Sequence, residues 1–216
     1  MKAALFDLDG VIVDTENQYT AFWSEMQRLY LPDNVDFALQ IKGQSLTCIL
    51  KEYFLGENVR REVLRRLEAF EATMSYPYIN GARAFVESLK AAGVPTAIVT
   101  SSNKAKMDQL YKAIPDFRQL FIHILTAEDF RQSKPSPDCY ITAARRLGIC
   151  PEDCVVFEDS FNGIEAGRLS GAFVVGLATT NPADVLTPLC DIVISDFCAD
   201  NLNKINKLFY LFKQKE

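Results

Sequence analysis

The sequence lacks the marks of membrane-spanning, secreted and nucleic-acid-binding proteins. No apolar run approaches the roughly 20 residues that a transmembrane helix needs, and the opening MKAALFDLDG has acidic residues where a signal peptide is apolar. The net charge is −5, whereas proteins bind nucleic-acid phosphates through clustered positive charge. The arginine-rich stretch 57–71 interleaves glutamates at helical spacing, which indicates a solvated helix face. We therefore expect a cytoplasmic protein that binds neither a membrane nor nucleic acid.

Histidine is scarce and cysteine forms no recognisable pattern. His123 is the single histidine, and the six cysteines are scattered along the chain. Cys150 and Cys154 are closely spaced, but no second pair of Cys or His residues lies nearby to complete a zinc site. A chain of 216 residues, 49% of them hydrophobic, can bury a substantial core without disulfides. We expect reduced thiols, no structural zinc, and a monomer, since no predicted helix face is too apolar for that core.

Short apolar runs recur along most of the chain, each followed by a polar turn and a helical pattern. The runs are continuous rather than alternating, which is typical of parallel strands buried on both faces. The predicted strands are Lys2–Phe6, Pro95–Thr100, Phe121–Leu125, Cys154–Glu158, Phe173–Leu177 and Asp191–Ile194. Helical patterns lie between them, at Gly81–Ala92, Lys104–Ala113, Pro137–Leu147 and Asn162–Ser170. This alternation predicts an α/β fold with a Rossmann-like parallel sheet.

One long stretch interrupts the alternation of strand and helix. From about residue 15 to residue 76 the pattern is helical throughout, which is too long for a single crossover between parallel strands. In its first helix, one apolar face is predicted to comprise Ala21, Phe22, Met26 and Leu29. Pro77 and Gly81 mark the exit from the stretch. We predict a small helical domain of residues 15–77, inserted into an α/β core of residues 1–14 and 78–216.

Polar side chains follow four of the predicted strands, directly at the end of three of them and, after the third strand, in the loop that opens the next helix. In chain order they are Asp7 and Asp9, Thr100, Lys134, and then Glu158 and Asp159. Because the carboxyl ends of parallel strands meet at one edge of the sheet, we expect these groups to lie close together. The carboxylates are hard oxygen ligands suited to Mg²⁺, and a hydroxyl with an ammonium suits a dianionic phosphate. The set predicts Mg²⁺-dependent phosphoryl transfer, which is catalysed mainly by positioning and charge neutralisation.

The two aspartates after the first strand suggest distinct chemical roles. A carboxylate can act as nucleophile and form an aspartyl-phosphate, and Asp7 is the candidate. Asp9 would serve as general acid and then general base. Each signal alone has a structural explanation, since Asp-x-Asp is common in turns, Thr100 or Asp159 can cap a helix, and Lys134 can be a surface lysine. Their occurrence at four consecutive strand ends favours catalysis.

These motifs resemble those of the haloacid dehalogenase-like superfamily. The residues that carry the resemblance are FDLDGVIVDT from Phe6 to Thr15, Thr100, KPSPD from Lys134 to Asp138, and EDS from Glu158 to Ser160 with Gly163 and Ala166. Within the superfamily the chain most resembles the β-phosphoglucomutase and phosphoglycolate-phosphatase-like group. In that group a helical cap domain is inserted just after the first motif, as predicted here.

The resemblance implies roles for individual residues. The Mg²⁺ ligands would be Asp7, Asp9 through its backbone carbonyl, Asp159, and Glu158 either directly or from behind the other ligands. Thr100 and Lys134 would hold the transferred phosphate. Its pocket would be lined by Gly10, Val11, Ser101, Ser102 and Asn103. Gln44 and Lys42 are candidates for substrate contact from the cap, although Lys42 and Gly43 can equally form a helix-terminal turn.

Two positions depart from the mutase pattern. Mutases of this group have a histidine in the first cap helix that helps to position the general acid, and the equivalent place here is Tyr19. They also have a cap arginine for the second phosphate, where this chain has Leu46. We therefore favour a phosphatase acting on a small phosphorylated metabolite such as a sugar phosphate. The alternatives are a sugar-phosphate mutase, a metal-independent haloacid dehalogenase, and a non-catalytic protein that binds a phosphometabolite.

Overall fold

The computed structural model describes residues 1–198, 204, 205, 207, 209 and 210 of the chain. These residues form one six-stranded sheet in the order β3-β2-β1-β4-β5-β6. Every neighbouring pair of strands is parallel. The strands are β1 Ala3–Phe6, β2 Thr96–Val99, β3 His123–Leu125, β4 Cys154–Glu158, β5 Phe173–Leu177 and β6 Ile192–Ile194. The predicted α/β fold is confirmed, and each strand lies within the range expected from the sequence.

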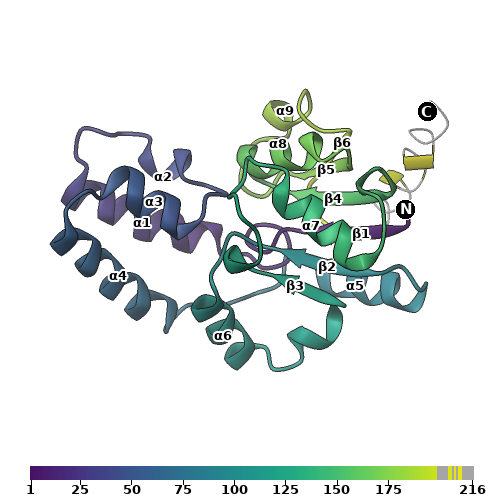
Figure 1. The fold of residues 1–216 in the computed structure, drawn as a ribbon, viewed down its shortest axis with the longest axis horizontal. Helices are drawn as coiled ribbons and strands as arrows, with labels where there is room; N and C mark the ends of the chain where they lie inside the picture. The colour runs from purple at the N-terminus through teal and green to yellow at the C-terminus, as the bar shows by residue number, and fades with distance from the viewer. Residues whose placement is uncertain (199–203, 206, 208, 211–216) are drawn as a thin grey trace.

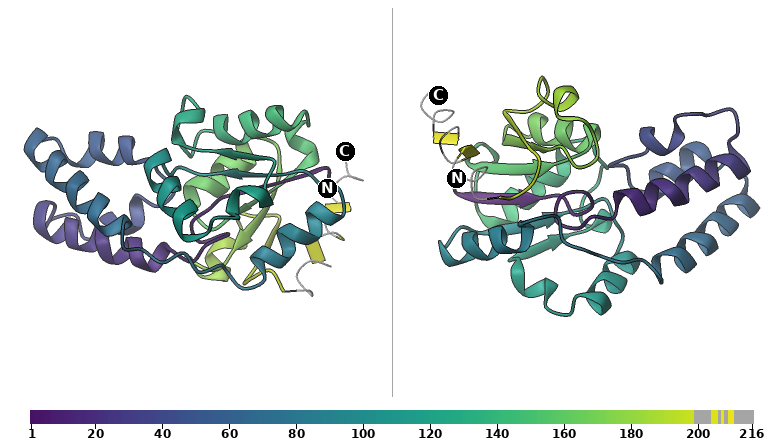
Figure 2. Two further views of the ribbon diagram at one scale, coloured as in Figure 1. Left: turned by 90° about the horizontal axis from the view of Figure 1, so that it is seen from below. Right: turned by 180° about the vertical axis from the view of Figure 1, so that it is seen from behind.

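Helices cover both faces of the sheet, as Figures 1 and 2 show. They are α5 Ala82–Ala91 and α6 Lys104–Ala113 on one face, and α7 Asp138–Leu147 and α8 Phe161–Leu169 on the other. Alternate residues of β1 serve the two layers, since Ala4 and Phe6 pack with α5 and α6, and Ala3 and Leu5 with α7 and α8. Burial on both faces explains why the strands are uninterrupted apolar runs. No helix in the described residues is long and apolar enough to cross a membrane.

Shorter elements complete the described part of the core. They are the four-residue helix α9 at Ala183–Leu186 and the 3₁₀ turns Phe117–Leu120, Ala127–Asp129 and Pro151–Asp153. The predicted core range also includes residues 199–203, 206, 208 and 211–216, which lie outside the described residues.

The stretch that interrupts the alternation folds as four helices beside one edge of the sheet, at the left in Figure 1. They are α1 Glu16–Tyr30, α2 Phe37–Gln40, α3 Leu46–Tyr53 and α4 Glu57–Glu71. We call them the helical insert. They bury an apolar cluster of their own, centred on Trp23, Met26, Phe37 and Phe54. The insert therefore has a separate core from the two layers of the sheet.

The predicted apolar face of α1 is only half correct. Phe22 and Met26 are buried, but Leu29 is 47% exposed and Ala21 is exposed. The buried face is rotated toward the aromatic residues Trp23 and Tyr30, whose rings contact Phe54. The larger aromatic surfaces set the packing direction, because the free energy of burial scales with apolar area.

The two connections between the insert and the core run side by side. Val13 and Tyr78 form an antiparallel bridge. Asp14 N donates to Pro77 O at 2.8 Å, and Ile79 N donates to Ile12 O at 2.9 Å. The chain therefore enters and leaves the helical insert at one point next to β1.

The strand order reverses at β1, which lies between β2 and β4 (Figure 1). In open parallel sheets such a switch point leaves a crevice at the carboxyl ends of the strands, where ligands bind. Phe6 of β1 pairs with Phe157 of β4, so the residues that follow these two strands emerge next to each other. Asp7 N donates to Phe157 O at 3.0 Å, which fixes the start of the loop after β1.

Candidate active site

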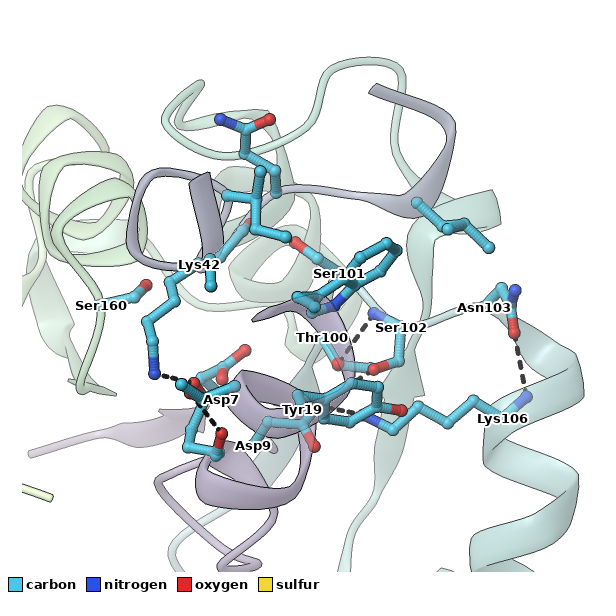
Figure 3. A pocket seen from close by; sticks show the side chains of 18 of the residues that line it. Asp7, Asp9, Tyr19, Lys42, Thr100, Ser101, Ser102, Asn103, Lys106 and Ser160 are labelled. Carbon is cyan, nitrogen blue, oxygen red and sulfur yellow. Dashed lines mark hydrogen bonds and ion pairs between the residues drawn. The ribbon is translucent and has the colours of Figure 1, made fainter. Parts of the chain in front are cut away.

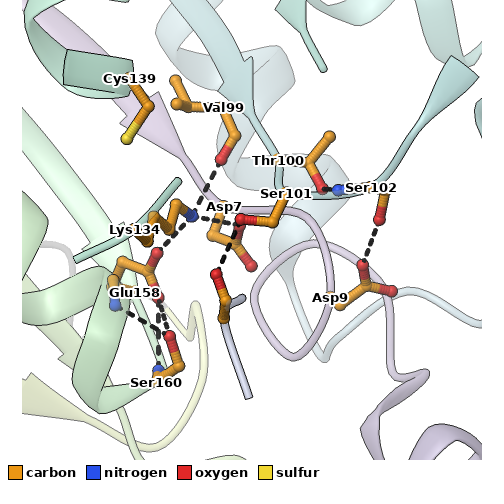
Figure 4. Close-up of polar contacts among 12 residues, drawn as sticks. Asp7, Asp9, Val99, Thr100, Ser101, Ser102, Lys134, Cys139, Glu158 and Ser160 are labelled. Carbon is orange, nitrogen blue, oxygen red and sulfur yellow. Dashed lines mark hydrogen bonds and ion pairs between the residues drawn. The ribbon is translucent and has the colours of Figure 1, made fainter. Parts of the chain in front are cut away.

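A buried lysine joins two carboxylates at the switch point. Lys134 is only 2% exposed, and its Nζ donates to Asp7 Oδ1 at 2.6 Å, Glu158 Oε1 at 2.6 Å and Val99 O at 3.1 Å (Figure 4). An ammonium has three donors, so all of them are engaged. Glu158 is fully buried and also accepts from Tyr140 Oη at 2.7 Å. Charge thus ties the loops after β1 and β3 to the carboxyl end of β4.

The negative charge of the carboxylates around Lys134 exceeds the positive charge of the lysine. Burial raises the pKa of Asp7 to about 7; Lys134 opposes the rise, while Glu158 and Asp9 add to it. Burial, and then the nearby charges of Glu16 and Glu158, raise the pKa of Asp159 well above its usual range. Raised carboxyl pKa values at a buried cluster show that further positive charge would be favourable there.

Three of these acids fit a divalent metal ion. Asp7, Glu158 and Asp159 each offer a carboxylate oxygen, and the three oxygens lie within 4.8 Å of one another. A set made only of carboxylate oxygens suits a hard cation of the Mg²⁺ class rather than a softer metal. The backbone also favours the approach of Asp159, because Gly10 has φ 73° and a Cβ there would lie 2.1 Å from Asp159 Oδ2. The acidic cluster can therefore hold a divalent cation.

Asp9 lies apart from this cluster and has different partners. Its Oδ1 accepts from the Thr15 hydroxyl. Its Oδ2 accepts from Ser102 Oγ at 3.0 Å and from Lys106 Nζ at 2.5 Å, and Figure 3 shows these three residues. Burial alone would raise the pKa of Asp9, but the charge of Lys106 and these hydrogen bonds outweigh it and lower the pKa below its usual value. Two aspartates two residues apart are thus held in opposite electrostatic environments.

A pocket lies between the strand ends and the helical insert, and Figure 3 shows it from close by. On the side of the sheet it is lined by Asp7, Asp9, Thr100, Ser101, Ser102, Asn103 and Asp159. On the side of the insert it is lined by Glu16, Tyr19, Trp23, Lys42, Gln44, Leu46 and Glu71. The predicted residues of both sides thus meet at one cavity.

Four predicted residues are not part of the pocket wall, and one of them, Val11, is fully buried in the core. Lys134 and Glu158 lie beneath Asp7, and Gly10 lies against Asp159 and Thr180. Thr100 reaches the pocket but is 1% exposed, and its Oγ1 accepts from Ser102 N at 3.0 Å. The roles of all these residues stay predictions at this point.

One turn of the helical insert contacts the core directly. Asn162 Nδ2 donates to Lys42 O at 2.7 Å, Ser101 Oγ donates to Gly43 O at 2.8 Å, and Ser45 N donates to Ser133 Oγ at 3.0 Å. Lys42 Nζ lies 2.6 Å from Glu16 Oε2 within the pocket. Lys42 and Gly43 therefore do form a helix-terminal turn, and this turn also brings Lys42 and Gln44 to the pocket.

The pocket residues that sequence reasoning missed include Glu16, Trp23, Glu71 and Lys106. Lys106 offered one signal. It is the third residue of α6, and a cation near a helix N-terminus is disfavoured by the helix dipole. Glu16 and Glu71 lie on amphipathic helices, where nothing in the sequence separates pocket-facing polar residues from solvated ones, and Trp23 belongs to the apolar cluster of the insert.

Known proteins are similar to this chain in sequence and in fold. The family model of haloacid dehalogenase-like hydrolases matches residues 1–171. Hexitol phosphatase A of Escherichia coli is 33% identical over 190 residues, which cover 85% of each of the two chains. A β-phosphoglucomutase of Mycobacterium bovis is 27% identical over an alignment of 239 residues, covering 91% of this chain and 90% of the relative. A solved haloacid dehalogenase hydrolase (family IA, variant 3) from Entamoeba histolytica has a TM-score of 0.80 at 23% identity, covering 99% of this chain and 100% of that chain.

Proposed function

The chain belongs to the haloacid dehalogenase-like hydrolase family, and on that basis we propose that it is a Mg²⁺-dependent phosphatase of small phosphate monoesters. The observation that carries the proposal is the buried Lys134 that binds both Asp7 and Glu158, with Asp159 close enough to share a cation. This combination supports Asp7 as the nucleophile, because Lys134 supplies beside it the positive charge that a phosphoryl group requires. The hexitol phosphatase relative supports hydrolysis as the reaction.

The proposed reaction has two halves that use Asp7 and Asp9 in turn. In the first, an Asp7 oxygen attacks phosphorus, the bond from phosphorus to the leaving oxygen breaks, and Asp9 gives that oxygen a proton. In the second, Asp9 takes a proton from water as the water oxygen attacks phosphorus. The bond between phosphorus and Asp7 then breaks and returns the free carboxylate. General acid–base catalysis of this kind typically contributes about 10²–10⁴ to the rate.

Positive charge in the site offsets the charge of the transferred group. Mg²⁺ held by Asp7, Glu158, Asp159 and the backbone carbonyl of Asp9 would supply electrophilic stabilisation when bound. Lys134 would act on the phosphate mainly through its charge, because its three donors already bind protein oxygens. Thr100 and the Ser101–Asn103 loop would supply hydrogen bonds to the phosphate oxygens, since they lie on the pocket wall.

The pocket favours a leaving group without a second phosphate. Among the described residues, its wall has no arginine or histidine, and the two lysines there are already paired, Lys42 with Glu16 and Lys106 with Asp9. Gln44 Oε1 is buried and has no hydrogen-bond partner among the described residues, so a hydroxyl of the substrate is a suitable donor to it. We propose a hydroxyl-rich leaving group such as a sugar or sugar alcohol.

The lack of an unpaired cation on the described pocket wall also favours hydrolysis over phosphate migration. A mutase must bind a bisphosphate, and positions 19 and 46, where such enzymes have His and Arg, are pocket residues Tyr19 and Leu46 here. The mutase relative keeps this second activity open to test. Phosphate release without migration to another hydroxyl supports the phosphatase, whereas migration that depends on a bisphosphate contradicts it.

We propose that the helical insert acts as a cap domain with the predicted bounds 15–77. Its separate apolar cluster and its paired connections at Val13 and Tyr78 support movement as a unit. Closure of such a domain excludes water and lets insert residues select the leaving group.

Gly43→Ala tests the contact that closes the insert on the core. Gly43 has a left-handed backbone with φ 79°, which costs a residue with a Cβ about 1–2 kcal/mol. The added Cβ would also lie 2.6 Å from Ser160 Oγ. We expect KM for the best monoester to rise about tenfold, which is the equilibrium change that 1.4 kcal/mol produces. The measurement is steady-state phosphate release. Gly148→Ala is the matched control, because Gly148 has φ 71° but its Cβ would meet nothing within 4 Å. An equal rise in KM for both variants would show that closure is not involved.

Metal removal and a substrate panel test the proposed function itself. Chelation should abolish phosphate release from a panel of sugar, sugar-alcohol and nucleotide monoesters, and added Mg²⁺ should restore it. Mg²⁺ at 100 times its Kd should also stabilise the folded protein by about 2.7 kcal/mol. Thermal unfolding with and without Mg²⁺ provides that second measurement. Full turnover in chelator would contradict the proposal.

A further inference from the structure

Lys106 is a buried charge in the pocket that the proposed reaction steps leave without a role. It projects from α6 of the core and is 4% exposed. Its Nζ lies 2.5 Å from Asp9 Oδ2 and 4.3 Å from the centre of the Tyr19 ring (Figure 3). The ammonium therefore stands between the aspartate after β1 and the first helix of the insert.

The polar groups around Lys106 come from three parts of the chain. Asp9 receives hydrogen bonds from Thr15 at one oxygen and from Ser102 and Lys106 at the other. On the insert side, the Tyr19 hydroxyl donates to Glu71 Oε1 at 2.8 Å, so this hydroxyl is bound to Glu71 rather than to Asp9. Lys106 is thus the charged partner of Asp9, and Tyr19 supplies a ring face to that cation.

Stability does not account for a lysine at this position. A buried ion pair is often no more stable than apolar residues of the same size, and a cation in the first turn of a helix opposes the helix dipole. Apolar residues in place of both Lys106 and Asp9 would avoid both costs. The arrangement instead fixes one side chain in one orientation, because both Asp9 oxygens are bound by donors from separate elements.

We propose that Lys106 is a positioning residue that fixes the Asp9 carboxyl group toward the leaving-group oxygen. The proposal rests on the proposed phosphatase function, in which Asp9 exchanges a proton with that oxygen and later with water. Because Lys106 belongs to the core rather than to the insert, it keeps its bond to Asp9 when the insert opens. Asp9 is then already in position when water reaches the phosphorylated Asp7, which favours hydrolysis.

Leaving-group dependence distinguishes positioning from a general structural role. An alkyl phosphate needs a proton on its leaving oxygen, whereas nitrophenolate leaves without one. We expect Lys106→Met to reduce kcat/KM about 10²-fold for an alkyl monoester, the lower end of what general acid catalysis contributes. The reduction for p-nitrophenyl phosphate should be less than about fivefold, because this step does not use the acid. The ratio of kcat/KM for the alkyl monoester to kcat/KM for p-nitrophenyl phosphate, measured on one sample, does not depend on the fraction of folded protein.

A double-mutant cycle and a control on the same helix complete the experiment. In an Asp9→Asn background, Lys106→Met should cause no further loss on the alkyl ester, because its effect acts through Asp9. Lys112→Met removes an exposed lysine from the same helix and should leave both esters unchanged. Equal losses on both esters, or additive losses in the cycle, would overturn the proposal. Absence of phosphate release from the unaltered protein on either ester would instead overturn the proposed function.

Discussion

Asp7→Asn is expected to reduce phosphate release by a factor of at least about 10³. The amide is a poor nucleophile, and the change also removes a carboxylate oxygen from the set with Glu158 and Asp159. Lys134 would keep Glu158 as its charged partner, so the buried ammonium stays paired. The fold should therefore survive, and the loss should appear in kcat with p-nitrophenyl phosphate as well as with metabolite esters.

The matched control for this change is Asp14→Asn. Asp14 belongs to the same sequence motif but is exposed and lies outside the pocket wall. Its replacement should leave turnover within about threefold, as is usual for surface changes away from a site. Turnover by Asp7→Asn that approaches that of the control would show that the phosphoryl group does not pass through Asp7.

Lys134→Met is expected to have the largest effect on stability. It leaves Asp7 and Glu158 buried without their shared counterion, and breaking a buried pair typically costs about 3–5 kcal/mol. The measurement is urea unfolding of the metal-free protein. Phosphate release should also fall, because the charge beside the nucleophile is lost.

A second substitution separates the electrostatic cause from a packing defect. Glu158→Gln in the Lys134→Met background removes one of the two unpaired charges, so it should recover part of the lost stability without restoring activity. If Lys134→Met unfolds at the same urea concentration as the parent, the lysine is not what stabilises the two carboxylates. If the double variant is less stable than the single one, charge is not the cause.

The sheet could be predicted from the sequence because burial on both faces leaves a local signal. The strands are largely apolar runs, and polar residues that follow four of them mark the edge where ligands bind. The same reasoning was weaker for the helical insert. Ala21 and Leu29 share the periodicity of Phe22 and Met26 but are exposed, because the aromatic rings of Trp23 and Tyr30 set the packing direction. Periodicity identifies an amphipathic helix but not the centre of its buried face.

In the candidate site, too, some residues could be predicted from the sequence and others could not. Asp7, Thr100 and Asp159 follow strands directly, so the topology alone brings them together. Lys106 could not be placed from the sequence, because its partner Asp9 lies 97 positions earlier and α6 is otherwise an ordinary amphipathic helix. Glu16 and Lys42 meet only through the packing of the insert. Long-range pairs between helices leave no local pattern to read.

The central claim is that the phosphoryl group passes through Asp7. Rapid quenching during turnover, followed by borohydride reduction, converts a phosphorylated aspartate to homoserine, which mass spectrometry locates in the sequence. We expect homoserine at position 7 only when the monoester and Mg²⁺ are both present, and none in Asp7→Asn. Unmodified Asp7 throughout turnover, or homoserine at another position, would contradict the account.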